Sequence, residues 1–241
     1  MLRRVIRGVA LAGVAAYAVY GVIRTRRGDL SHHERTRALP GDDLVDAVTF
    51  TETDAVTIAA TPSQVWPWLA QIGYGRAGWY CCARCNRVDL EPHEEWRILP
   101  QFQALTPGAT LPVYAEGGLK ITAVEPERML VLFGNAAMAR DQGVPYISGA
   151  SHPAEVGGPL PIPEFAVSWA FLMEPLAEGR TRLFARYRAA LSPAARSHRL
   201  LQPVTGLGIF WLQRKQLRGI KLRAEYSRRM QMKAGRSGLA A

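Results

Sequence analysis

The segment 206–232, GLGIFWLQRKQLRGIKLRAEYSRRMQM, has the pattern of a long helix and decides the fold. At about 100° per residue, one set of apolar side chains falls on a single face of that helix. This set consists of Ile209, Phe210, Leu217, Ile220 and Ala224. A second apolar set lies across from the first and consists of Trp211, Leu212, Leu222 and Tyr226. A helix that is apolar on two sides is expected to be surrounded by other elements rather than laid on one surface.

The segments before this helix are rich in β-branched or alternating apolar residues, which predicts strands. The predicted strands are residues 48–60, 110–114, 120–124, 129–134, 166–174 and 182–191. In the last of them Ala185 and Tyr187 share one face, whereas Arg186 and Arg188 share the other. Such alternation predicts an antiparallel sheet with one buried face and one solvent-exposed face.

A short helix is predicted over residues 62–72, after the first strand. Thr61 is the expected N-cap and Pro62 the first helical residue, while Pro67 should break or tighten the helix. The segment 135–164 is rich in Gly and Pro and has no sustained period, which predicts a long loop that acts as a lid or a mobile insertion. This order of elements predicts an α+β fold, in which a twisted antiparallel sheet curls around the terminal helix.

The N-terminus predicts a membrane anchor. Residues 5–23 are uncharged apart from Arg7, and a bilayer-spanning helix needs about 17–25 apolar residues. A cleaved signal peptide is the alternative, but this apolar run meets Arg24 instead of a small-residue cleavage site. The expected division is an anchor (1–27), a linker (28–46), one globular domain (47–232) and a disordered tail (233–241). The arginines that flank the anchor favour, by a small margin, a single-pass protein with a cytoplasmic globular domain.

Positive charge is concentrated near the C-terminus. Residues 180–241 contain 12 Arg and 3 Lys but a single acid, Glu225. Lipid headgroups, nucleic acid or a solvated basic face would each account for this asymmetry. Modules that bind nucleic acid interleave exposed aromatic rings with the positive charge, whereas Phe210, Trp211 and Tyr226 are needed here for packing. We therefore expect headgroup binding by the terminal helix and no nucleic-acid partner.

Several motifs, in this order along the chain, resemble the SRPBCC, or START-like helix-grip, superfamily. They are ATP at 60–62, VWPWLAQIG at 65–73, GRAGWY at 75–80, ILPQFQ at 98–103 with Pro-Gly at 107–108, and RKQLRGIK at 214–221. The resemblance spans residues 45–230 and implies a helix-grip fold with a hydrophobic cavity between sheet and helix. Members of the superfamily bind lipids, sterols or polyketides, and a few are cyclases, aromatases or hydratases. The chain departs from this pattern at the cysteines of 81–85 and in the length of the segment 135–164.

The aromatic residues of these segments, with one leucine of the terminal helix, are the candidate ligand contacts. They are Trp66, Trp79, Tyr80, Trp96, Phe102, Trp169, Phe171, Tyr187, Phe210 and Leu217. Aromatic rings offer a large apolar area, and Tyr or Trp can orient a polar group of a ligand. The alternative for each ring is that it only fills the core. Trp169 and Tyr187 are the best candidates, because they lie on late strands that face the helix.

Metal binding and catalysis have weaker support. Cys82 and Cys85 have CxxC spacing and His93 follows, but zinc usually needs four ligands and no second pair is present. Residues 91–95, together with His152 and Glu155, could supply a general base, although such polar runs usually form solvated loops. We therefore expect no metal, no cofactor and no assigned catalytic residue.

Three functions remain open. The leading hypothesis is a membrane-anchored binding or transport protein for a lipid-like or polyketide-like molecule. The second is a cyclase or aromatase acting in the same cavity, and the third is a protein-binding domain with a collapsed cavity. An all-apolar interior would favour transport, whereas a buried Glu or His beside a Tyr would favour catalysis.

Overall fold

The computed structural model describes residues 30–81, 96–114, 117–143, 164–191 and 196–238. The predicted anchor (1–27), Cys82, Cys85 and most of the predicted loop 135–164 therefore lie outside the described residues. Among the helices that the structure describes, none is long and apolar enough to cross a bilayer.

One antiparallel sheet of six strands forms the body of the domain, in the order β1-β6-β5-β4-β3-β2. The strands are β1 (Phe50–Ile58), β2 (Thr110–Tyr114), β3 (Gly117–Glu125), β4 (Met129–Asn135), β5 (Phe165–Leu176) and β6 (Arg180–Leu191). Each corresponds to a predicted strand, with ends that differ by a few residues. The prediction of an α+β fold built on an antiparallel sheet is confirmed.

Two of the helices correspond to predicted ones, α3 (Pro62–Ala70) and α5 (Arg196–Gly238). Thr61 is the N-cap of α3 as expected, but Pro67 lies inside the helix without ending it. Because proline has no N–H, the helix lacks the hydrogen bond from residue 67 to the Ser63 carbonyl, which lies in the exposed first turn. α5 begins before residue 206 and continues into the segment 233–241 that the sequence assigns to a tail.

Two short helices lie where the sequence predicted none, α2 (His32–Thr36) and α4 (Ala136–Asp141). α4 occupies the start of the predicted loop 135–164. The side chain of Asn135 caps it, with Oδ1 accepting a hydrogen bond of 2.9 Å from the Met138 N–H.

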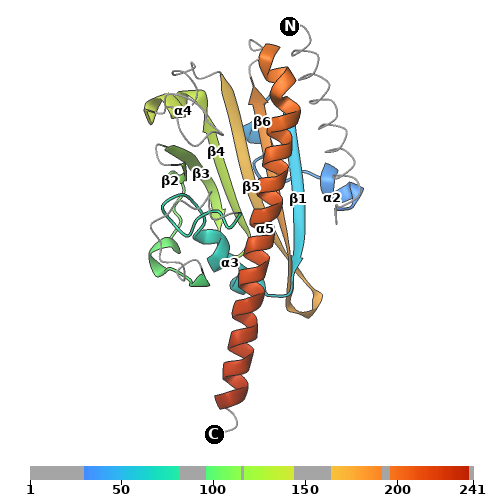
Figure 1. Cartoon of the computed structure of the whole chain (residues 1–241), viewed down its shortest axis with the longest axis vertical. Helices are drawn as coiled ribbons and strands as arrows, with labels where there is room; N and C mark the ends of the chain where they lie inside the picture. Colours follow the sequence, from blue (N-terminus) through green and yellow to red (C-terminus); the bar gives the residue numbers. More distant parts are fainter. Residues whose placement is uncertain (1–29, 82–95, 115–116, 144–163, 192–195, 239–241) are drawn as a thin grey trace, which may run out of the picture.

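α5 crosses one face of the curved sheet, and its C-terminal part projects beyond the end of the sheet (Figure 1). We call the covered side of the sheet the inner face. One arc of α5 is buried there, and Leu217, Ile220 and Ala224 are each 1% exposed or less. They pack in one core cluster with Leu183 and Ala185 of β6.

The prediction that α5 is embraced on two sides is wrong. Of the second apolar set, Leu212 is partly buried against the core, but Trp211 is 49% exposed, Leu222 56% and Tyr226 46%. The helical period locates two apolar arcs but cannot tell which of them meets the sheet. Since the sheet covers only one side of α5, the opposite arc remains at the surface.

Hydrogen bonds to the end of β1 hold α5 in place. Lys221 Nζ donates to the Thr57 carbonyl at 2.6 Å, and Arg228 donates to the Ala59 carbonyl at 2.6 Å. Glu225 Oε1 accepts from the Ala59 N–H at 2.9 Å. Burial by itself would raise the pKa of the Glu225 carboxyl, but the hydrogen bonds from Ala59 and Lys221 hold that pKa below its ordinary value.

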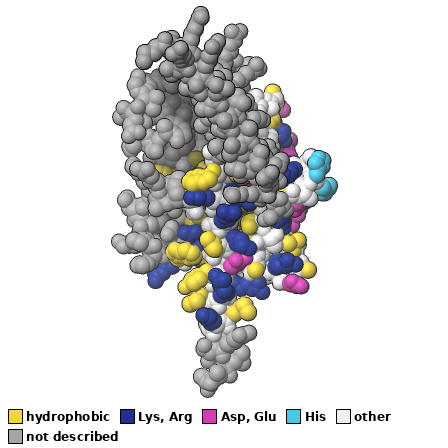
Figure 2. Space-filling model, turned by 45° about the vertical axis from the view of Figure 1, so that its right-hand side comes forward, with side chains coloured by type: hydrophobic (Ala, Val, Ile, Leu, Met, Phe, Trp, Pro, Cys, Tyr) yellow, Lys and Arg dark blue, Asp and Glu magenta, His cyan; other side chains and the backbone are white. Residues whose placement is uncertain are grey.

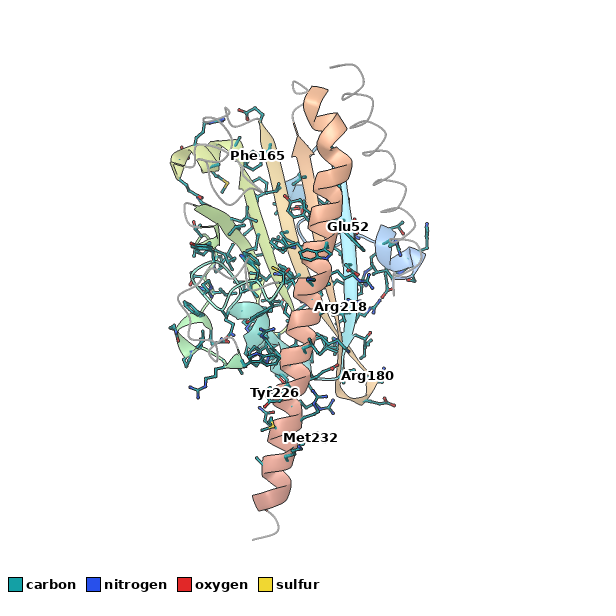
Figure 3. The ribbon with its side chains drawn as sticks, in the orientation of Figure 1. Glu52, Phe165, Arg180, Arg218, Tyr226 and Met232 are labelled. Carbon is teal, nitrogen blue, oxygen red and sulfur yellow. The ribbon has the colours of Figure 1, made fainter. Side chains whose placement is uncertain are left out.

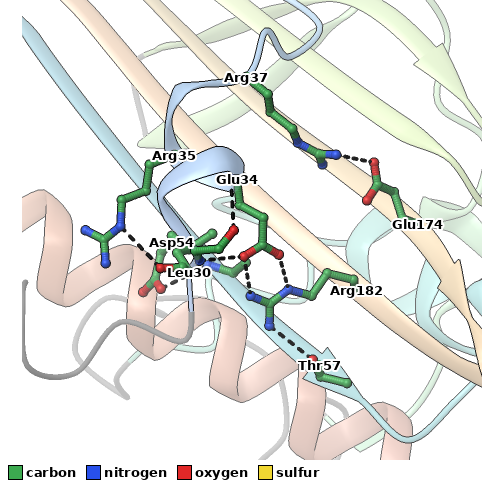
Figure 4. Close-up of polar contacts among 10 residues, drawn as sticks. Leu30, Glu34, Arg35, Arg37, Asp54, Thr57, Glu174 and Arg182 are labelled. Carbon is green, nitrogen blue, oxygen red and sulfur yellow. Dashed lines mark hydrogen bonds and ion pairs between the residues drawn. The ribbon is translucent and has the colours of Figure 1, made fainter.

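The opposite, outer face of the sheet is covered by residues 30–46, which the sequence assigns to a linker. Arg186 was expected to be exposed to solvent but is only 5% exposed. It donates to Asp42 Oδ2 at 2.6 Å and to the Arg35 carbonyl at 2.9 Å. Arg182 pairs with Glu34 of α2 at 3.0 Å, as Figure 4 shows. The arginines of β6 therefore bind this segment to the sheet.

Gly219 allows the closest approach of α5 to the rest of the domain. A Cβ at this position would lie 2.5 Å from Tyr80 Cβ and 2.6 Å from the Tyr80 carbonyl oxygen, whereas a Cβ at Gly208 would meet nothing within 4 Å. Because the Tyr80 backbone cannot move aside easily, Gly219→Ala should lower the free energy of unfolding by about 1–3 kcal/mol. Gly208→Ala, on the same helix, is the control and should raise it by up to about 1 kcal/mol. Urea unfolding measures both; equal stabilities would mean that α5 does not lie this close to Tyr80.

Candidate functional site

An aromatic cluster occupies the inner face of the sheet. Trp79 and Trp169 stack with ring centroids 5.1 Å apart and planes within 13°. Tyr187 meets the edge of Trp169 at 6.1 Å, and Phe171 lies 5.3 Å from the same ring. Offset-stacked and edge-to-face contacts are the geometries that aromatic rings prefer. The structure thus brings together four of the predicted ligand contacts.

Strand alternation and one turn place these rings. Trp169 of β5 is the register partner of Tyr187 of β6, so that both side chains point to the same face. Trp79 arrives from the turn after α3, where Gly73 and Gly78 have positive φ and bond to each other. Its indole N–H donates to the Val113 carbonyl at 3.3 Å.

Some buried polar atoms of β5 and α5 have no hydrogen-bond partner among the described residues. Gln216 of α5 is 0% exposed, and within the described part of the chain neither its amide oxygen nor its amide nitrogen has a hydrogen-bond partner. The Trp169 indole N–H and Gln213 Oε1 also lack partners there. Gln213 Nε2 donates to the Ala185 carbonyl at 3.0 Å, which fixes this residue over the inner face. Each unsatisfied group costs about 1–3 kcal/mol, so these atoms are available to a ligand or a water molecule.

Two buried acids on β1 face the same side of the sheet. Glu52 is 1% exposed and Asp54 is 4% exposed. Glu52 is the register partner of Tyr187, and Asp54 that of Ala185, which places both carboxyls on the inner face. Figure 3 shows Glu52 on the strand that runs beside α5. Arg214 of α5 lies 3.7 Å from Asp54.

Neither acid was a candidate in the sequence analysis. A period-two signal was present, because Phe50, Glu52 and Asp54 alternate with threonine and alanine residues along β1. Residues that alternate in this way share one face of a strand. A buried face is usually recognised by its apolar side chains, so a face that carries two acids does not look buried in the sequence.

Tyr187 is neutral at physiological pH. Burial raises the pKa of its phenol to about 12, since the charged phenolate is poorly solvated there. The hydroxyl group can therefore donate or accept a hydrogen bond but does not act as a base near pH 7.

Tyr80, another predicted ligand contact, is hydrogen-bonded within the protein. Its hydroxyl accepts a hydrogen bond from Gln71 Nε2 at 2.9 Å and donates to the Trp68 carbonyl at 3.2 Å. Gln71 Oε1 also accepts from the Leu99 N–H at 3.0 Å, which joins α3 to the segment after residue 96. The Tyr80 hydroxyl and the Gln71 amide are thus already paired within the protein, and contact of Tyr80 with a ligand stays a prediction.

The other candidates are dispersed around the cluster. Trp96 is 43% exposed and meets the Tyr226 ring of α5 edge-on at 5.7 Å, so it lies at the surface. Phe102 is partly buried beneath the Arg76 guanidinium, which lies 4.6 Å from its ring. The remaining three, Trp66, Phe210 and Leu217, are buried. Their contact with a ligand stays a prediction.

The metal and acid–base candidates are not brought together. Cys81 is a buried thiol, whereas Cys82, Cys85, residues 91–95, His152 and Glu155 lie outside the described residues. Within the described ranges no group of three or more His, Cys, Asp or Glu side chains is placed to hold a metal ion.

No family model matches the sequence, and no curated protein matches it. Solved structures are similar at low scores. MLL2253 of Mesorhizobium loti has 18% identity and a TM-score of 0.41, covering 73% of this chain and 98% of its own. The hypothetical protein jhp0584 of Helicobacter pylori has 12% identity and a TM-score of 0.44, covering 78% and 95%.

A third solved structure is the Polyketide_cyc-like protein Cgl2372 of Corynebacterium glutamicum. It has 18% identity and a TM-score of 0.31, covering 71% of this chain and 88% of its own. TM-scores this low carry no argument about the present chain. The arrangement in this structure itself, a curved antiparallel sheet covered by a long C-terminal helix, is the one that the sequence resemblance implied. In its fold the chain is similar to the SRPBCC, or START-like helix-grip, superfamily.

Proposed function

We propose that this protein binds an apolar small molecule, lipid-like or polyketide-like, between the inner face of the sheet and α5. The observation that carries the proposal is the combination of stacked aromatic rings with buried polar atoms that have no hydrogen-bond partner in the described part of the chain. Such a combination is typical of ligand sites, where apolar walls give affinity and a few polar groups give orientation.

The polar atoms narrow the class of ligand. A Gln216 amide offers one donor group and one acceptor, and the Trp169 indole offers a donor. A hydroxyl or carbonyl group on the ligand would satisfy them, whereas a pure hydrocarbon would leave them unpaired. Burial of about 300 Å² of apolar surface would contribute roughly 7 kcal/mol, so rings supply most of the affinity and the amide supplies selectivity.

Substitution of Gln216 should separate these two contributions. The probes are 1,8-dihydroxyanthraquinone, which carries hydroxyl and carbonyl groups, and anthracene, which carries neither. Gln216→Leu should weaken binding of the first about tenfold and leave anthracene binding unchanged, while Trp169→Leu should weaken both. Fluorescence titration of the full chain measures the affinities, with the exposed Gln101→Leu as the matched control. If the wild type binds neither probe, the proposal fails; if Gln216→Leu binds both as the wild type does, the polar contact fails.

Glu52 supports a second candidate, a cyclase or aromatase acting on a polyketide-like substrate. Its carboxyl is buried on the inner face, and its register partner on β6 is Tyr187, whose phenol is neutral. A carboxylate there could accept a proton from the carbon beside a ketone, while the phenol donates a hydrogen bond to the ketone oxygen. A buried Glu beside a Tyr is the feature that distinguishes catalysis from transport.

Glu52→Gln tests this second candidate. It should abolish conversion of a poly-β-ketone thioester, followed by absorbance of the aromatic product, and leave 1,8-dihydroxyanthraquinone bound. Glu178→Gln, at an exposed turn, removes the same charge and should have no effect. If wild type, Glu52→Gln and protein-free buffer give equal rates, the protein does not catalyse this conversion, and the second candidate fails.

Membrane attachment is the third part of the proposal. The apolar run at 5–23 is proposed to anchor the chain as a single-pass protein with its domain on the cytoplasmic side. If so, the full chain should stay with host membranes after extraction at alkaline pH. The same extraction should release a variant that lacks residues 5–23. Complete extraction of the undeleted chain would rule out a spanning anchor.

A further inference from the structure

The side of α5 that faces away from the sheet carries a continuous exposed stripe. We call it the outer stripe; its residues are Trp211, Lys215, Arg218, Leu222, Tyr226, Arg229 and Lys233. At about 100° per residue these side chains share an arc of roughly 80°. The stripe contains four cations and no acid. Glu225, the acid next to it in the sequence, points instead to the end of β1.

The apolar members of the stripe are large and exposed. Trp211, Leu222 and Tyr226 keep about half of their surface accessible, and the exposed Met230 and Met232 flank the stripe near its C-terminal end. Lys215 Nζ lies 3.9 Å from the centre of the Trp211 ring, so that charge and apolar surface are interleaved. Figure 2 shows hydrophobic and basic side chains intermingled, with a few acidic ones, over the lower part of one side of the molecule. Clustered exposed apolar side chains of this size mark an interaction surface.

We infer that the outer stripe docks on the surface of an anionic lipid bilayer. An interfacial helix lies in the membrane plane, with aromatic and aliphatic side chains among the acyl chains and Lys or Arg at the headgroups. Basic residues near an anionic leaflet are attracted to it, while Trp and Tyr settle at the level of the headgroups. The composition of the stripe fits each of these requirements.

Other occupants fit less well. Two copies of the stripe placed face to face would bring their cations together, which opposes self-association. The exposure of Trp211 and Tyr226 removes the packing argument against nucleic acid that the sequence suggested. However, Leu222, Met230 and Met232 are aliphatic and cannot stack on bases, and one convex helix offers no groove to follow a phosphate backbone.

Docking in this way would place α5 between the bilayer and the proposed ligand site. The buried arc of α5 carries Gln213 and Gln216, while the outer stripe lies on the opposite side of the same helix. The inference itself does not depend on a ligand, since it stands on the exposed side chains alone. It also does not depend on the predicted anchor, because the contact belongs to the folded domain.

The test uses the full chain reconstituted in nanodiscs whose lipids carry brominated acyl chains, which quench nearby tryptophan fluorescence. The contribution of Trp211 is the difference between the wild type and Trp211→Phe. It should be quenched in nanodiscs that contain phosphatidylserine, and much less in phosphatidylcholine alone or at high salt. This readout reports contact of the stripe even if residues 5–23 already hold the chain in the bilayer.

Charge variants give the matched comparison. The stripe variant is Lys215→Gln, Arg218→Gln, Arg229→Gln and Lys233→Gln; the control, with the same change of net charge, is Lys120→Gln, Arg128→Gln, Arg140→Gln and Arg180→Gln. The stripe variant should lose the phosphatidylserine-dependent quenching, with an apparent affinity at least about tenfold lower. The control should keep it.

Three results would overturn the inference. The first is equal quenching of Trp211 in neutral and anionic nanodiscs, or in the stripe variant and the wild type. The second is shielding of Trp211 from iodide in detergent, with a doubled mass, which would assign the stripe to a second copy. The third is protection of Trp211 by a single-stranded oligonucleotide but not by anionic lipid.

Discussion

The attachment of α5 to the end of β1 sets the position of every other functional feature. Lys221 and Arg228 donate to backbone carbonyls of this strand end, while Glu225 accepts a backbone N–H. These charge-assisted bonds are stronger than neutral ones. They fix both the rotation of α5 about its axis and its position along that axis. Gly219 then lets α5 reach the Tyr80 backbone. One arc of α5 is thereby committed to the inner face, and the opposite arc to the surface.

The inner face combines features that stability alone does not require. Stacked rings and leucines would make an adequate core, yet this one also contains Gln216, whose buried amide atoms have no hydrogen-bond partner among the described residues. Burial of a polar group costs free energy unless its hydrogen bonds are satisfied, and burial of a charge costs more. The Gln216 amide therefore supports the proposal of a ligand that would meet it. The outer face shows the contrast, because its buried Arg186 is bonded to Asp42 and to backbone carbonyls.

The sequence predicted the elements and much of the aromatic cluster for clear physical reasons. Strand alternation placed Trp169 and Tyr187 on the face toward the helix, and a period of 3.6 residues located two apolar arcs on α5, one of which is buried. What it could not predict depends on pairing between distant residues. Arg182 and Arg186 looked solvent-exposed because their partners, Glu34 and Asp42, lie more than a hundred positions earlier. Glu52 follows the period-two pattern of β1, but only the pairing of β1 with β6 shows that its face is the inner one. The exposure of Trp211 depends on the sheet, which covers one side of α5.

Native mass spectrometry of the full chain, purified from its host membrane, tests the central claim most directly. The account predicts a non-covalent complex whose extra mass, after release, belongs to an apolar molecule with a hydroxyl or carbonyl group. The Trp169→Leu variant, purified in the same way, should carry less of this bound molecule. A wild-type chain that consistently carries no such molecule, and acquires none when a lipid extract of the host is added, would contradict the account.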